Sequence, residues 1–131
     1  DELILTIQEN SVGPWIPAAY LIWNNPMMAV GGDTFIHSMI KCAGIKNVFE
    51  KLKRYPLVDD EAINQSNTKL LLLSSEPFPF DEKHKQGFQK RFPDIPVLLI
   101  DGEMCSWYGS RMKKGLNYLR QQKAHWRKAL S

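Results

Sequence analysis

The stretch Val97-Leu-Leu-Ile100-Asp-Gly-Glu-Met-Cys-Ser-Trp-Tyr-Gly-Ser-Arg111 decides the fold class, because an apolar run passes directly into acidic, aromatic and basic residues. The same order recurs twice. Residues 19–23 precede Asn24-Asn-Pro-Met-Met28, and residues 70–73 precede Ser74-Ser-Glu-Pro-Phe-Pro-Phe80. In open α/β sheets, ligands bind beyond the carboxyl ends of the strands. The three stretches therefore predict three strands whose ends share one binding edge.

The three predicted strands are apolar along their whole length, which is typical of parallel strands covered by helices on both faces. Helices between such strands supply the crossover connections. The expected helices cover residues 33–43, 60–66, 82–91 and 110–128. We therefore predict an α/β fold, a three-layer α/β/α sandwich around a mainly parallel sheet of about four strands.

Local signals predict where these helices begin and end. Acidic N-caps are expected at Asp33, at Asp59 or Asp60, and at Asp81. Gly44 is expected to end the first helix. A minor strand is expected at 47–49, and residues 55–58 are expected to be extended because a residue before proline avoids the helical region.

Length and composition describe one soluble-type domain of 131 residues with a formal net charge of +3. No segment approaches the roughly 18–20 apolar residues that span a bilayer. Lys and Arg gather at residues 113–128, where they suit the negative end of a helix dipole. We expect no nucleic-acid partner.

Residues with catalytic or metal-binding chemistry are few. Cys42 and Cys105 lack metal-type spacing, and Cys42 is expected in the core. The serines at 74–75 lack the Gly-x-Ser-x-Gly elbow, and residues 31–34 lack the glycine spacing of a nucleotide loop. His84 is expected on a solvated helix face. We predict no catalytic residue, no metal site and no cofactor, although Glu76 and Glu103 could form a carboxylate pair.

Large aromatic side chains gather just after the predicted strands and in the connecting loops. They are Trp23, Tyr55, Phe78, Phe80, Trp107 and Tyr108. Such a cluster predicts a contact surface for a flat, partly apolar ligand. The alternative for Phe78 and Phe80 is that they fold back onto their own core.

Five motifs occur in an order that resembles one family. They are Gly31-Gly-Asp-Thr-Phe-Ile36, Ala43-Gly-Ile-Lys-Asn-Val-Phe49, Arg54-Tyr-Pro-Leu-Val-Asp-Asp-Glu61 and the stretches 74–80 and 101–111. Together they resemble the C-terminal lobe of the helical-backbone (class III) periplasmic substrate-binding proteins. That family serves ABC importers of vitamin B12, ferric siderophores and haem.

The resemblance implies that this chain is one lobe of a two-lobed binding protein. Residues 1–12 would be the tail of the helix connecting the lobes, and residues 13–131 the C-terminal α/β lobe. The N-terminal lobe and the signal would lie outside this sequence. The implied location is periplasmic, and the implied partners are a metal-chelate or corrinoid ligand, the N-terminal lobe and the ABC transporter permease.

The ligand contacts predicted from the strand ends and from the resemblance are Trp23, Tyr55, Ser75, Glu76, Phe78, Glu103, Trp107, Tyr108 and Arg111. By resemblance, Tyr55 matches an aromatic position that packs on the ligand, and Glu103 matches an acidic ligand-facing position. Glu61 matches a glutamate that docks to the permease, or serves only as a first-turn acid. Trp107 replaces a basic contact, and Arg111 has a binding or a structural role.

The sequence leaves the ligand open among a corrinoid, a ferric siderophore and a haem. It also leaves two other function classes open. One is an α/β enzyme using the same strand-end loops, and the other is a protein-interaction module.

Overall fold

The computed structural model describes residues 15–105 and 111–130. Its strands are β1 (Ile16–Trp23), β2 (Met28–Ala29), β3 (Ile45–Asn47), β4 (Leu70–Ser74) and β5 (Val97–Ile100). Its helices are α2 (Phe35–Cys42), α3 (Asp60–Gln65), α4 (Glu82–Arg91), α5 (Gly102–Cys105) and α6 (Met112–Leu130). The expected helical tail at 1–12 lies outside the described residues.

One mainly parallel sheet forms the middle layer. Strand β1 pairs in parallel with β4 on one side, and β4 pairs in parallel with β5. On its other side β1 pairs in parallel with β3 near its start and antiparallel with β2 near its end. The carboxyl ends of β1, β4 and β5 therefore lie along the same edge of the sheet.

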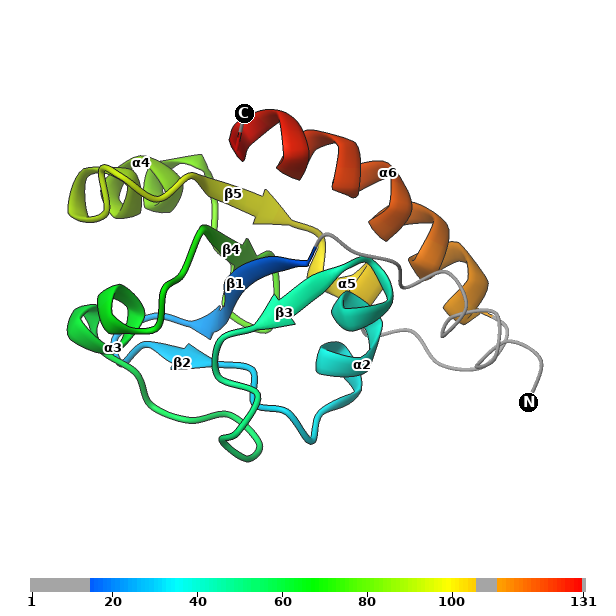
Figure 1. Cartoon of the computed structure of the whole chain (residues 1–131), viewed down its shortest axis with the longest axis horizontal. Helices are drawn as coiled ribbons and strands as arrows, with labels where there is room; N and C mark the ends of the chain where they lie inside the picture. The colour runs from blue at the N-terminus through cyan, green and yellow to red at the C-terminus, as the bar shows by residue number, and fades with distance from the viewer. Residues whose placement is uncertain (1–14, 106–110, 131) are drawn as a thin grey trace.

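Helices cover both faces of this sheet, with α2, α5 and α6 on one side and α3 and α4 on the other (Figure 1). Alternate residues of β1 enter opposite layers: Tyr20 and Ile22 pack with α2 and α6, whereas Ala19 and Leu21 pack toward α3 and α4. Both faces of the central strands are thus buried, which explains their uninterrupted apolar sequence. The predicted three-layer α/β/α fold is confirmed.

Several predicted boundaries agree closely with the structure. Helix α4 begins after its N-cap Asp81 and ends at Arg91, and β5 occupies 97–100, as expected. Asp59 rather than Asp60 caps α3. Gly44 follows α2 with a φ of 87°, the left-handed conformation that glycine adopts without strain.

Other local predictions were wrong. Thr34, not Asp33, caps α2 and accepts from the His37 amide at 3.1 Å, because the Asp33 carboxylate instead accepts from the Arg54 amide. The minor strand lies at Ile45–Asn47 rather than at 47–49. Strand β2 and helix α5 were not expected. Cys42 is half-buried at the margin of the core.

Among the described residues, no helix combines the length and the apolar character that crossing a bilayer requires.

Candidate functional site

The ends of β4 and β5 are joined by a hydrogen-bonded corner. The Ser75 amide donates to the Ile100 carbonyl at 2.9 Å, and the Gly102 amide donates to Ser75 Oγ at 3.0 Å. The Ser74 hydroxyl donates to the Glu76 carbonyl at 2.6 Å. A Cβ at position 102 would lie 2.1 Å from Ser74 Oγ, so only glycine lets the two loops approach this closely.

The ends of β1 and β4 are joined through aromatic side chains. The Phe78 amide donates to the Ile22 carbonyl at 3.2 Å, which draws the loop after β4 against the end of β1. The Trp23 and Phe78 rings then meet edge to face, with centroids 5.5 Å apart. Trp23 keeps 38% of its surface exposed. The structure therefore brings together two predicted ligand contacts and leaves one of them open to solvent.

Behind this pair, the aromatic series continues into the core. Phe78 also contacts Phe80 and His84 edge to face, with centroids 4.7 and 5.1 Å away. Phe80 is buried, so the fold-back alternative applies to it, whereas Phe78 is only partly buried. The prediction that His84 lies on a solvated helix face was wrong. The His84 ring contacts both phenylalanines, and it accepts a hydrogen bond from the Asp81 amide in a capping box.

The acidic side chains of the corner are exposed. Glu76 lies in the loop after β4 and Glu103 in the first turn of α5, and both are exposed. The Asp101 carboxylate accepts from the amides of Glu103 and Met104, which fixes the start of α5. The Asp101 amide in turn donates to the Tyr118 hydroxyl at 2.7 Å, which ties the corner to α6. The β4–β5 corner therefore presents two exposed carboxylates, Glu76 and Glu103.

Tyr55 lies apart from the aromatic pair, on a segment along the outer side of β2. Two glycines make this arrangement possible, because a Cβ at Gly31 would lie 2.5 Å from the Leu52 carbonyl oxygen and one at Gly32 only 1.9 Å from that of Glu50. The glycine motif thus serves close backbone approach. Tyr55 is 43% exposed.

Of the three remaining predicted ligand contacts, one lies among the described residues and two do not. Arg111 is exposed immediately before α6. Trp107 and Tyr108 lie outside the described residues.

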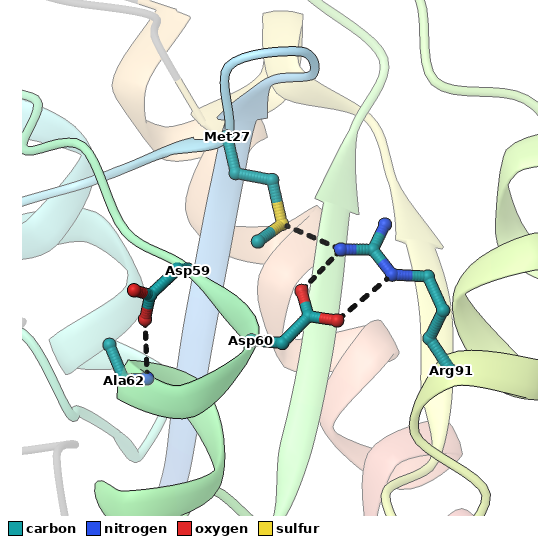
Figure 2. Close-up of polar contacts among 5 residues, drawn as sticks. All are labelled: Met27, Asp59, Asp60, Ala62 and Arg91. Carbon is teal, nitrogen blue, oxygen red and sulfur yellow. Dashed lines mark hydrogen bonds and ion pairs between the residues drawn. The ribbon is translucent and has the colours of Figure 1, made fainter.

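Glu61 is exposed in the first turn of α3, and its neighbours hold that turn in place. Asp59 accepts from the Ala62 amide at 2.8 Å, and Asp60 forms an ion pair with Arg91 (Figure 2). The Arg91 guanidinium also lies 4.6 Å from the centre of the Phe88 ring, where a cation–π contact forms. Of the three acidic residues, Glu61 alone neither caps α3 nor pairs with Arg91, and it accepts only from Gln65 within the described residues.

The Cys105 thiol and the Tyr20 hydroxyl near the corner are buried. Burial raises the pKa of the Cys105 thiol to about 12 and raises that of Tyr20 well above its usual value. The Tyr20 hydroxyl donates to Ser74 Oγ at 3.2 Å. Among the described residues, no three His, Cys, Asp or Glu side chains are arranged to hold a metal ion.

Two surface hollows lie away from this corner. One, of about 220 Å³, is lined by Trp15, His37, Lys41, Ile45, Lys46 and Glu50. The other, of about 770 Å³, is lined by Pro17 and by residues of 46–52 and 62–67. Both adjoin the starts of β1 and β3.

Comparison with solved structures finds a similar fold in several periplasmic binding proteins. The chain matches a possible iron-binding (periplasmic solute-binding) protein from Staphylococcus epidermidis with a TM-score of 0.71 at 22% identity, over 92% of this chain and 49% of that one. It matches the periplasmic haem-binding protein HutB of Vibrio cholerae with a TM-score of 0.71 at 15% identity, over 95% and 52%. It matches the vitamin B12 binding protein BtuF of the same species with a TM-score of 0.70 at 13% identity, over 97% and 50%.

No protein-family model matches the sequence, and a search of curated proteins finds no match either. The chain spans about half the length of the solved structures it resembles. Its fold is that of one lobe of these periplasmic binding proteins, as the sequence motifs predicted.

Proposed function

We propose that this chain is one lobe of the solute-binding component of an ABC importer and binds its ligand without catalysis. The supporting observation is that nearly the whole chain matches about half of several periplasmic binding proteins. These neighbours are a possible iron-binding protein, a haem-binding protein and a vitamin B12 binding protein. A corrinoid, an iron-siderophore or a haem-type compound is therefore the proposed ligand class, and a periplasmic location follows from the same proposal.

The proposed ligand surface is centred on Trp23 and Phe78. A planar macrocycle gains from stacking on an exposed aromatic face, and Phe78 supports the Trp23 ring from the side. Ser75, Glu76 and Glu103, exposed in the loops after β4 and β5, are proposed as further contacts. Tyr55, Trp107, Tyr108 and Arg111 complete the proposed set from neighbouring segments. The N-terminal lobe would cover the opposite side of the ligand.

The proposed permease contact is Glu61. Its neighbours fix the first turn of α3, so this exposed carboxylate is presented in a defined position. Surface charges of this kind act mainly on association rate and orientation. Charge reversal at Glu61 should slow docking to the cognate permease, and reversal at the exposed Glu82 on α4 serves as the control.

The ligand site is tested by an amide NMR titration with cyanocobalamin, a gallium-loaded siderophore and a diamagnetic haem analogue. Shifts are expected around Trp23, residues 75–78 and Glu103 with one ligand class. A nanomolar two-lobed binder corresponds to about −12 kcal/mol, and loss of half the contacts leaves micromolar or weaker binding for one lobe. NMR detects such weak binding directly.

Two tryptophans provide a matched pair for this titration. Trp15 is 42% exposed, close to the 38% of Trp23, but lines the hollow near the starts of β1 and β3. Trp23→Ala should weaken binding about tenfold, and Trp15→Ala should leave it unchanged. Equal losses in the two variants, or shifts confined to the Trp15 hollow, would refute the proposed ligand surface.

A further inference from the structure

The chain between β3 and α3 forms an additional, outermost edge of the sheet. Residues 54–58 run antiparallel to the β2 hairpin: the Gly31 amide donates to the Arg54 carbonyl at 2.7 Å and the Ala29 amide to the Pro56 carbonyl at 3.0 Å. The Val58 amide donates to the Met27 carbonyl at 3.1 Å. The segment lies along the outer side of β2 in Figure 1. These bonds use the carbonyls of Arg54 and Pro56 and the amide of Val58, so the backbone groups of these alternate residues face β2.

The backbone groups of Tyr55 and Leu57 face the other way. Leu57 forms an antiparallel bridge with Met28 of the type in which its own amide and carbonyl point outward. Within the described residues, no hydrogen bond uses the amide or carbonyl of either residue. The Leu57 side chain is 69% exposed and that of Tyr55 43%. This edge therefore offers unused hydrogen-bonding groups beside exposed apolar surface.

Pro56 does not interrupt this outward row. Its backbone belongs to the inward-facing set, because its carbonyl accepts from Ala29. The amide that a proline lacks would therefore have faced β2 rather than solvent. The outward amides of Tyr55 and Leu57 are both present.

Charge is distributed unevenly along the edge. Lys51 and Lys53 precede it and Arg54 is its first residue, whereas the acidic residues Asp59, Asp60 and Glu61 follow it. Of these acids, Asp59 caps α3 and Asp60 pairs with Arg91, which leaves Glu61 as the carboxylate presented to a partner. If two such segments align antiparallel, the basic end of each lies beside the acidic end of the other. A parallel alignment instead places like charges together, which is unfavourable. The charge order thus favours pairing with an identical segment in antiparallel orientation.

We propose that residues 54–58 pair antiparallel with the same residues of a second copy of this chain, around a two-fold axis at Pro56. Tyr55 then lies opposite the partner's Leu57, and each such pair exchanges two backbone hydrogen bonds. The contact is self-complementary, so it closes as a dimer. This inference goes beyond the proposed transport function. Because the contact includes Tyr55 and lies beside Glu61, self-pairing would compete with the ligand and permease contacts proposed for these two residues.

Self-association is tested first by sedimentation velocity and by amide hydrogen exchange over a range of protein concentrations. The amides of Tyr55 and Leu57 should exchange more slowly as concentration rises. The Val58 amide, already bonded to Met27, should be protected at every concentration. A monomer throughout the millimolar range, or a dimer that leaves the Tyr55 and Leu57 amides unchanged, overturns the proposal.

A charge-swap series tests the orientation of the contact. Lys51 and Glu61 lie five residues on either side of Pro56, so the two-fold axis brings Lys51 of one copy toward Glu61 of the other. Lys51→Glu changes both ends of this symmetric contact and should weaken the dimer about tenfold. Glu61→Lys should weaken it similarly, and the double variant should recover wild-type association because the opposite charges meet again. Lys83→Glu, an equal charge change on exposed α4, is the matched control.

The swap series also separates this contact from other modes of association. Recovery in the double variant supports antiparallel self-pairing, since simple loss of a side chain cannot be rescued by a second reversal. Additive weakening in the double variant, or equal effects of Lys51→Glu and Lys83→Glu, overturns it. Thermal unfolding by circular dichroism confirms that each variant is folded before its association is compared.

Discussion

Replacement of Gly32 by alanine should destabilise the protein strongly, because the backbone of the β3–α3 connection passes against this residue. An alanine Cβ at position 32 would lie 1.9 Å from the Glu50 carbonyl oxygen and 2.8 Å from its carbonyl carbon. Both are backbone atoms, so no flexible side chain can move away. The two segments must separate by roughly 1.5 Å to restore an ordinary contact distance of about 3.5 Å.

This separation breaks the hydrogen bonds that hold the connection. The Gly32 amide donates to the Leu52 carbonyl at 2.8 Å and the Gly31 amide to the Arg54 carbonyl at 2.7 Å. The Asp33 carboxylate, which accepts from the Arg54 amide, moves with them. At about 1 kcal/mol for each bond, the expected loss in the free energy of unfolding is about 3 kcal/mol. Tyr55 lies on the displaced segment, so its position changes too.

Urea denaturation measures the loss. With a slope of about 2 kcal/mol per M, the Gly32→Ala midpoint should fall by about 1.5 M. Gly87→Ala is the matched control, because a Cβ there meets nothing within 4 Å in the middle of α4. That variant should be about 0.5–1 kcal/mol more stable than wild type. A Gly32→Ala midpoint within about 0.2 M of wild type would refute the close approach.

Three further predictions follow from burial and capping. The His84 amide, which donates to the Asp81 carboxylate, holds the pKa of Asp81 below its usual value. The ionised carboxylate therefore stabilises the folded state fully above about pH 4, and this stabilisation is lost as pH falls through the lowered pKa. In the Asp81→Asn variant, the urea midpoint should fall less steeply at acid pH than it does in the wild type. Cys105, whose pKa burial raises to about 12, should react with iodoacetamide at pH 8 only in denaturant, as followed by mass spectrometry. Trp126→Ala should lower the free energy of unfolding by about 3–5 kcal/mol in the same urea assay, since Trp126 is buried between α6 and the sheet.

Elements with strong local signals could be predicted from the sequence. The N-cap Asp81 marks the start of α4, and the prolines after α4 separate it from β5. These signals lie next to the elements that they bound, so they can be recognised without knowledge of the fold. The apolar strands show in the same way that both sheet faces are buried. The order of the motifs was sufficient to predict the lobe fold, which the solved structures share.

The candidate site could be predicted only in outline. Trp23 and Phe78 lie more than fifty residues apart, and the hydrogen bond between Phe78 and Ile22 brings their rings together. Nothing in the spacing indicated that Phe80 would enter the core while Phe78 remained partly exposed. His84 looked like a solvated helix residue because its aromatic neighbours come from the preceding loop.

The sequence by itself determined the longer helices and the three central strands, and that these strands are covered on both faces, because periodicity and capping act over a few neighbouring residues. Only the tertiary structure decided that Thr34 caps α2, since the carboxylate of Asp33 is occupied by an amide 21 residues later. It also decided that Gly31 and Gly32 serve close approach of the 50–54 backbone. Such contacts join segments distant in the chain, and their free energy depends on where the whole fold places them.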